Sequence, residues 1–178
     1  MTKAETTAGK NLLITGLPGV GKTTLIRKLA AELQFLHPAG FYTTEIRESG
    51  VRRGFKLISF TGDRRILSHV DIKGRFRVGK YGVDIAGFEN FLETINIQNP
   101  GCGLIIIDEI GKMECLSDRF KSFLETALSA DKLMIATIAL KGGGIISEVK
   151  QRNDVTLFNV TPTNRNSLLS PILSHTAS

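Results

Sequence analysis

The sequence predicts an α/β fold in which helices cover a parallel β-sheet. An apolar segment at 11–15 leads into a glycine-rich loop and an amphipathic helix, and further apolar segments at 104–107 and 132–138 alternate with helical patterns. Uninterrupted apolar strands are typical of sheets covered on both faces, and strand-helix alternation is typical of parallel sheets. The chain of 178 residues suits one domain. We therefore expect a flexible tail at 1–10 and a single domain at 11–178.

Composition places the chain among ordinary globular proteins, with 42% hydrophobic and 22% charged residues. No apolar run approaches the length of a membrane span, and the first residues do not resemble a signal peptide. We therefore expect a cytoplasmic protein without a membrane partner. Cys102 and Cys115 are too few and too far apart for a disulfide framework, and we expect reduced thiols. His37, His69 and His175 lack metal-ligand spacing.

The loop after the first strand has the spacing of a phosphate-binding loop. Gly16, Gly21, Lys22 and Thr23 match G-x-x-x-x-G-K-[ST]. Glycines let successive backbone N–H groups surround an anion at the start of a helix. We expect Lys22 to reach the β- and γ-phosphates and the Thr23 hydroxyl to hold Mg²⁺. The residues expected to contact the nucleotide here are Gly16, Leu17, Pro18, Gly19, Val20, Gly21, Lys22, Thr23 and Thr24.

The segment after the first helix reads as β-structure rather than as a further strand-helix unit. Strand-like patterns at 40–46 and 51–60 are separated by a turn signal, and shorter ones follow near 66–70 and 76–83. We expect an antiparallel β-hairpin insertion at about 40–83.

Capping residues mark the helices that follow. Asp84 is a predicted N-cap of a helix that ends at 99–101, and Ser117 is a predicted N-cap of the next helix. Both helices carry apolar residues along one face. Beyond the strand at 132–138, the pattern predicts a glycine loop at 142–144, a short helix at 145–152, a strand at 155–160 and a terminal helix at 164–173.

Two acids follow the apolar strand at 104–107. Ligands of open α/β sheets bind beyond the carboxyl ends of the strands, so Asp108 and Glu109 are expected to face the phosphate-binding loop. Asp108 is expected to hold Mg²⁺, directly or through water, together with Thr23. Glu109 suits a general base that orients the attacking water, and Lys22 and Glu109 are therefore the predicted catalytic residues.

The chain resembles the THEP1 nucleoside-triphosphatases, which include the cancer-related nucleoside-triphosphatase, over nearly its whole length. The matching stretches are 16–26, Gly-Phe-Tyr-Thr at 40–43, Arg-Val-Gly-Lys-Tyr at 77–81, Asp-Glu-Ile-Gly-Lys-Met-Glu at 108–114 and Arg-Asn-Asp-Val at 152–155. The resemblance implies a RecA-like sheet, Mg²⁺ and slow hydrolysis of nucleoside triphosphates (NTPs) with loose base preference. The chain departs from the family pattern at Thr44 and in the glycine-containing segment 140–146. The resemblance adds these residues to the nucleotide site: Asp108, Glu109, Ile110, Gly111, Lys112, Met113, Glu114 and Cys115.

The net charge of +6 is concentrated in one segment. Residues 47–80 contain ten Lys or Arg and three acids. Three interpretations of this segment fit its charge: a surface that binds nucleic acid, a source of cations for a polyphosphate site, or a solvated hairpin surface. The sequence does not distinguish among these interpretations. Lys80, Lys112, Arg47 and Arg53 are equal candidates for an additional cation at the γ-phosphate.

Three functions fit these features. The preferred one is Mg-dependent hydrolysis of ATP, GTP and other NTPs to nucleoside diphosphate and phosphate by a monomer. A P-loop kinase acting on a small molecule or nucleoside is the first alternative, although Glu109 directly after Asp108 favours water as the acceptor. A nucleic-acid-binding protein that uses the NTP as a switch is the second, weakened by the scarcity of aromatic residues among the charges at 47–80.

Overall fold

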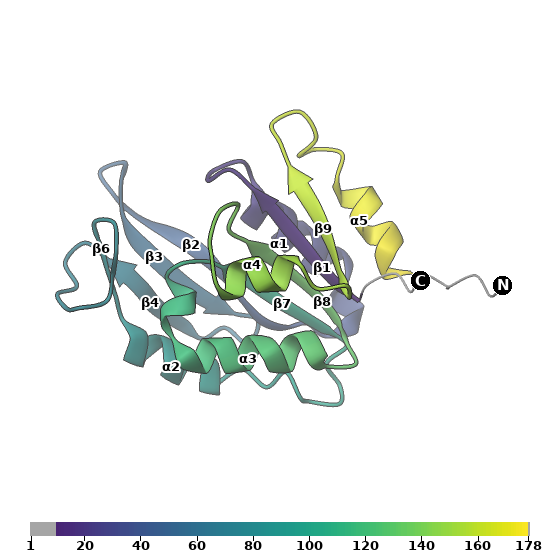
Figure 1. Cartoon of the computed structure of the whole chain (residues 1–178), viewed down its shortest axis with the longest axis horizontal. Helices are drawn as coiled ribbons and strands as arrows, with labels where there is room; N and C mark the ends of the chain where they lie inside the picture. Colours follow the sequence, from purple (N-terminus) through teal and green to yellow (C-terminus); the bar gives the residue numbers. More distant parts are fainter. Residues whose placement is uncertain (1–9, 178) are drawn as a thin grey trace.

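The computed structural model describes residues 10–177, which form one mixed sheet with helices on both faces (Figure 1). The predicted tail at 1–10 lies outside the described residues except for Lys10. The strands are β1 (Asn11–Gly16), β2 (Ala39–Glu48), β3 (Val51–Ser59), β4 (Arg64–His69), β5 (Arg77–Val78), β6 (Tyr81–Val83), β7 (Leu104–Ile110), β8 (Leu133–Ile138) and β9 (Val155–Val160). The helices are α1 (Lys22–Glu32), α2 (Ile85–Glu93), α3 (Asp118–Ser129), α4 (Ile145–Lys150) and α5 (Leu169–Thr176), with 3₁₀ turns η1 (Gln34–Leu36) and η2 (Glu114–Leu116).

The sheet has the strand order β5-β6-β4-β3-β2-β7-β8-β1-β9. The five strands from β2 to β9 in this order pair in parallel, which confirms the predicted α/β fold with a parallel sheet. Because the strands run in one direction, the carboxyl ends of β1, β7 and β8 meet at the same edge. The phosphate-binding loop and the two acids therefore approach one another there, as the sequence predicted.

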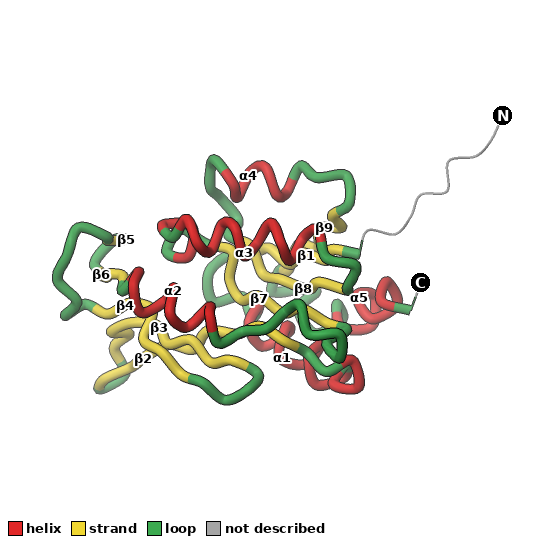
Figure 2. The backbone as a smooth tube through the Cα atoms, turned by 90° about the horizontal axis from the view of Figure 1, so that it is seen from below, coloured by secondary structure: helices red, strands yellow, loops and turns green. Residues whose placement is uncertain are grey.

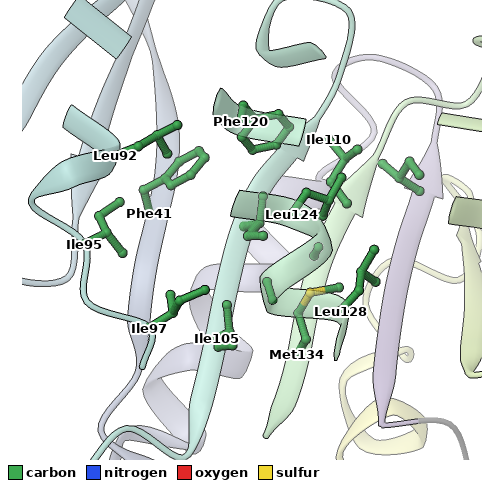
Figure 3. Close-up of a cluster of buried hydrophobic side chains, with 14 of the residues drawn as sticks. Phe41, Leu92, Ile95, Ile97, Ile105, Ile110, Phe120, Leu124, Leu128 and Met134 are labelled. Carbon is green, nitrogen blue, oxygen red and sulfur yellow. The ribbon is translucent and has the colours of Figure 1, made fainter. Parts of the chain in front are cut away.

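Helices form a layer on each face of the sheet. Figure 2 shows α2, α3 and α4 on one side and α1 and α5 on the other. On the first side, Phe41 meets Phe88 and Phe91 edge to face, with ring centroids 6.1 and 5.8 Å apart. Figure 3 shows Phe41 of β2 in the same hydrophobic core as Phe120, Leu124 and Leu128 of α3. Each such ring stabilises the fold by about 1.5–3 kcal/mol through its burial alone.

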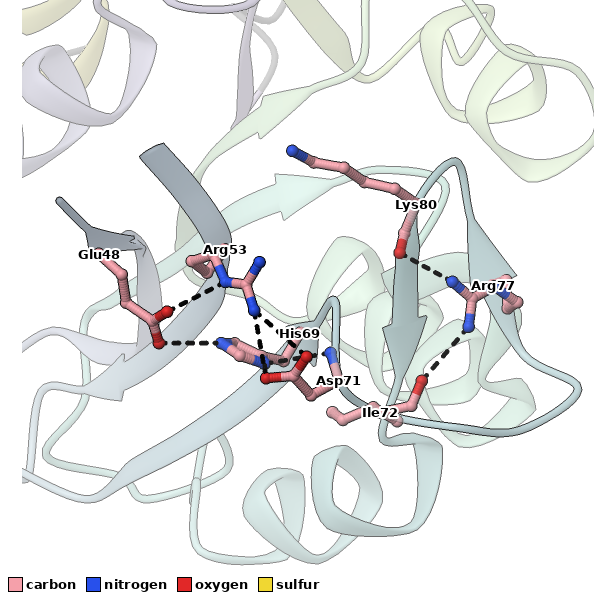
Figure 4. Close-up of polar contacts among 7 residues, drawn as sticks. All are labelled: Glu48, Arg53, His69, Asp71, Ile72, Arg77 and Lys80. Atoms are coloured by element: carbon pink, nitrogen blue, oxygen red, sulfur yellow. Dashed lines mark hydrogen bonds and ion pairs between the residues drawn. The ribbon is translucent and has the colours of Figure 1, made fainter. Parts of the chain in front are cut away.

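The antiparallel part of the sheet, residues 42–83, continues the parallel part without a break, and we call it the β extension. The strand β2 belongs to both parts, because its start pairs with β7 in parallel and most of its length pairs with β3 in antiparallel fashion. Charged contacts tie the strands together: the guanidinium of Arg53 lies between Glu48 and Asp71 (Figure 4). Arg77 donates to the carbonyl oxygens of Ile72 and Lys80 at 3.3 and 2.8 Å.

Local side-chain hydrogen bonds account for the helix boundaries. Asp84 accepts a bond from the N–H of Gly87 at 2.9 Å, and Ser117 accepts one from Phe120 at 3.0 Å, so both predicted N-caps are confirmed. Helix α4 ends at Lys150, two residues before its predicted end, and two other helix boundaries differ more from the prediction. Helix α2 ends at Glu93, well before 99–101, and its C-cap Thr94 returns a hydroxyl bond to the carbonyl of Phe91.

The terminal helix α5 begins at Leu169 rather than near residue 164. Thr161 and Asn164 exchange hydrogen bonds, from the N–H of Thr161 to Asn164 Oδ1 at 2.8 Å and from the N–H of Asn164 to Thr161 Oγ1 at 3.3 Å. Such side-chain contacts compete with helical hydrogen bonds and favour a turn. None of the helices in residues 10–177 is long and apolar enough to span a bilayer.

Candidate active site

The loop between β1 and α1 presents an open helix N-terminus. Gly21 precedes α1 with φ 113°, a left-handed conformation that favours glycine, and no side chain caps the first turn of the helix. Its backbone N–H groups are therefore available for an anion. Lys22 Nζ donates to the carbonyl oxygens of Gly16 and Leu17 at 2.9 and 3.3 Å, so the lysine lies against the loop that it follows.

Asp108 joins the loop to the sheet. Its carboxylate is 1% exposed and accepts a bond from the hydroxyl of Thr23 at 2.8 Å. Two residues that the sequence prediction missed complete its surroundings. Thr43 donates through its N–H and its hydroxyl, both at 3.2 Å, and Thr137 donates through its hydroxyl at 2.5 Å. Hydrogen bonds of this kind offset the cost of burying a carboxylate.

Glu109 and Glu114 converge above Gly111. A Cβ atom on Gly111 would lie 2.9 Å from Glu109 Oε1 and 2.8 Å from Glu114 Oε2, so a larger residue there would displace both carboxyl groups. Burial raises the pKa of Glu109; the charge of Lys22 opposes this shift and the charge of Asp108 adds to it. Burial, and then the charge of Glu109, raise the pKa of Glu114 to about 8. An ionised Glu109 therefore disfavours ionisation of Glu114.

These residues surround one cleft with a volume of about 1010 Å³. The predicted site residues that line it are Gly16, Leu17, Pro18, Gly19, Gly21, Lys22, Thr23, Thr24, Glu109, Gly111, Lys112, Met113 and Glu114. Four predicted residues do not line it. Val20 and Ile110 are buried in the two hydrophobic cores, Cys115 packs against the core of α2 and α3, and Asp108 lies beneath the surface of the cleft. Burial raises the pKa of the Cys115 thiol to about 12, so it stays protonated.

The basic residues divide into those that reach the cleft and those that do not. Lys112 lines it, and so do Arg52 and Lys141, which the sequence prediction did not single out. Arg47 pairs with Glu45 at 2.6 Å, and Arg53 is held by the two acids shown in Figure 4. Lys80 lies over the Tyr81 ring, with Nζ 5.4 Å from the centroid.

Comparison with known proteins identifies the family. A family model described as NTPase matches residues 11–173, which is most of the chain. The chain belongs to this NTPase family. The nucleoside-triphosphatase THEP1 of Thermotoga sp. (strain RQ2) is 46% identical over 164 residues, covering 92% of this chain and 93% of the relative. The human cancer-related nucleoside-triphosphatase is 38% identical over 182 residues, with 93% and 95% covered.

Solved structures agree with this membership of the NTPase family. The crystal structure of THEP1 from Aquifex aeolicus matches with a TM-score of 0.79 at 32% identity, covering 92% of this chain and 97% of that one. The solution structure of the human cancer-related nucleoside triphosphatase also gives 0.79, at 38% identity and with 92% and 95% covered. The THEP1 resemblance and the P-loop NTPase fold inferred from the sequence are therefore confirmed.

The donor set around Asp108 fits a hard divalent cation that is bound partly by its substrate. The hydroxyl of Thr23 and the carboxylate of Asp108 supply oxygen atoms 2.8 Å apart. No group of three or more His, Cys, Asp or Glu side chains within the described part of the chain is arranged to hold a metal alone. Mg²⁺ characteristically takes one or two protein ligands and fills its shell with phosphate oxygens and water.

Proposed function

We propose that the chain hydrolyses nucleoside triphosphates to nucleoside diphosphates and phosphate, with Mg²⁺ as cofactor. The observation that carries this proposal is the hydrogen bond from Thr23 to Asp108 at 2.8 Å, which joins the helix N-terminus to an acid near the carboxyl end of β7. The adjacent Glu109 faces the cleft on the same wall. The names of the THEP1 relatives support the same reaction.

The protein's part in this reaction is to bind and orient. The first turn of α1 offers N–H groups to the phosphates, and Lys22 exchanges its contacts with Gly16 and Leu17 for phosphate oxygens. Thr23 and Asp108 would hold Mg²⁺, which supplies positive charge at the β- and γ-phosphates. Thr43 and Thr137 fix the orientation of the Asp108 carboxylate through their hydrogen bonds.

Glu109 orients the attacking water. Its carboxyl group lies on the cleft wall next to the residue assigned to the metal, where an in-line water would stand. When water attacks the γ-phosphorus, the bond from this phosphorus to the bridging oxygen breaks and Glu109 accepts the proton. Lys112, Arg52 and Lys141 are the cleft-lining cations that are candidates to stabilise the developing charge.

Base specificity is proposed to be loose. The loop contacts are made to phosphates through the backbone, and these carry no information on the base. Thr161, which follows β9, is engaged in the turn with Asn164. A cytoplasmic monomer is proposed as the working form.

Phosphate release from ATP, GTP, CTP and UTP with Mg²⁺ tests the proposal. We expect release from several NTPs without any acceptor, and a loss of at least 100-fold in Lys22→Ala and in Glu109→Gln. Lys28→Ala, on the exposed face of the same helix, serves as the matched control. Release that requires an added acceptor would establish the kinase alternative, and salt-sensitive RNA or DNA binding that depends on bound NTP would establish the nucleic-acid alternative. Undiminished release from Glu109→Gln would refute the role of this residue while leaving the reaction intact.

A further inference from the structure

The cleft extends beyond the phosphate-binding loop. Its volume of about 1010 Å³ lies at the upper end of the range of roughly 300–1,000 Å³ that is typical of a pocket for one small molecule. The half that lies away from the phosphate-binding loop is formed by the β extension. Its wall consists of Arg52, Phe55, Leu67 and Tyr81, which we call the outer subsite.

Strand order decides which end of a bound nucleotide faces the outer subsite. From β1, which carries the loop, the sheet proceeds through β8 and β7 to β2 and the β extension, while β9 lies on the opposite side of β1. Thr23 and Asp108 are the residues assigned to the metal, which is expected between the β- and γ-phosphates. The hydroxyl of Thr23 donates to Asp108 of β7, so the metal lies on the β7 side of the loop. The terminal phosphate therefore points toward the β extension, and the nucleoside leaves the loop in the other direction.

The outer subsite is built for a flat, unsaturated ligand. The rings of Phe55 and Tyr81 meet edge to face, with centroids 5.5 Å apart, and Leu67, which lines the same cleft, is 1% exposed. The guanidinium of Arg52 lies over both rings, at 5.2 and 5.9 Å from their centroids. A planar guanidinium stacks on aromatic systems, and Arg52 lines the cleft, where a ligand ring can reach it.

Hydrogen bonds hold Arg52 in this position. Its Nε donates to the Tyr81 hydroxyl at 3.0 Å, and Nη1 donates to the carboxylate of Glu45 at 3.0 Å. Burial opposes ionisation of Glu45, but hydrogen bonds from Arg52 and Arg47 outweigh it and keep the pKa of Glu45 below its ordinary value. The Arg52 side chain is nevertheless 42% exposed, so this fixed group keeps an accessible surface on the cleft wall.

We propose that the outer subsite binds a second small molecule, a planar heteroaromatic compound of nucleoside size, beside the terminal phosphate of the bound nucleotide. The ligand ring stacks on Arg52 and packs against Phe55, while the triphosphate occupies the loop. This inference rests on the proposed function, since it uses the loop as the site of the NTP. It assigns a ligand to the aromatic wall formed by Phe55 and Tyr81, to which the proposed hydrolysis gives no role.

The test uses the full chain saturated with Mg²⁺ and the slowly hydrolysed analogue AMP-PNP. Adenosine, guanosine, cytidine, uridine and thymidine are then titrated by calorimetry, because nucleosides lack the phosphates that the loop binds. We expect at least one nucleoside to bind with one equivalent per chain and without displacing AMP-PNP. Arg52→Lys, which retains the charge but loses the planar group, and Phe55→Leu are each expected to weaken this binding about tenfold.

Arg75→Lys is the matched control, because Arg75 lies over the Phe76 ring at 4.7 Å but does not line the cleft. Its nucleoside affinity is expected to equal that of the native chain, and the melting temperature of each variant reports its folding. Absence of binding for all five nucleosides at millimolar concentration would overturn the inference. Competition between nucleoside and AMP-PNP would also overturn it, since the outer subsite would then hold the base of the NTP itself. Failure of AMP-PNP to bind at all would instead refute the proposed function.

Discussion

Glu114→Gln is expected to make the protein more stable at neutral and alkaline pH. The Glu114 carboxyl is 5% exposed, and burial raises its pKa from 4.5 to about 8. In the unfolded chain Glu114 ionises near its ordinary pKa of 4.5. Between pH 4.5 and pH 8, the folded state therefore keeps a proton on this group that the unfolded state has lost. The contribution of this group is therefore fully present below pH 4.5 and is lost as the pH rises through 8. Linkage gives a loss of roughly 4 kcal/mol in the free energy of unfolding between pH 5 and pH 9.

Glutamine matches the shape of the protonated acid and cannot ionise, so the variant should lack this loss. Urea unfolding of both proteins at pH 5, 6, 7, 8 and 9, without nucleotide or metal, measures the difference in their free energies of unfolding. This difference should grow by about 4 kcal/mol in favour of Glu114→Gln across the range. Glu93→Gln is the matched control, because Glu93 is 56% exposed. A difference that stays constant with pH would show that Glu114 is already ionised in the folded state and would refute the reasoning.

Two further substitutions test the hydrogen bonding of Asp108 and the packing of the hydrophobic core. Thr137→Val keeps the shape of the side chain but removes a hydroxyl bond to Asp108, and it should lower the free energy of unfolding by about 1.5–3 kcal/mol and reduce phosphate release. Thr126→Val, at an exposed position, should change neither quantity in urea unfolding and phosphate assays. Phe41→Ala removes a fully buried ring that contacts α2 and α3, and a loss of about 3–5 kcal/mol is expected by urea unfolding. A loss below 1 kcal/mol would show that the core closes around the vacated space.

Sequence patterns that span only a few neighbouring residues predicted the phosphate-binding loop and two helix N-termini. The spacing of Lys22 and Thr23 identifies the loop, and Asp84 and Ser117 identify two helix starts, because each signal arises from contacts within one turn of chain. The end of α2 was mispredicted because Thr94 closes the helix through a hydroxyl bond that propensity does not reveal.

The surroundings of Asp108 could not be predicted in the same way. Thr43 and Thr137 are 65 and 29 residues away from it in sequence, and only the pairing of β7 with β2 and β8 brings them together. A signal was present for Thr137 alone, which lies toward the carboxyl end of the predicted strand 132–138, whereas Thr43 lies in the middle of the predicted strand 40–46. Ile110 is the converse case, a residue that was predicted to line the site but does not. It belongs to a contiguous motif of the family, but its side chain points into the core while its neighbours face the cleft.

The strand β2 connects the β extension to the catalytic centre. Through Thr43, β2 holds the carboxylate assigned to the metal, and two residues later Glu45 holds Arg52 of the outer subsite. A displacement of the β extension that moves β2 must therefore alter the hydrogen bonds to Asp108, and a change at Asp108 must be felt at Arg52. Both residues lie in the part of β2 that is paired with β3, whereas the pairing of β2 with β7 is confined to residues 39–41. Occupation of the outer subsite is accordingly expected to change phosphate release even if the ligand never touches the nucleotide.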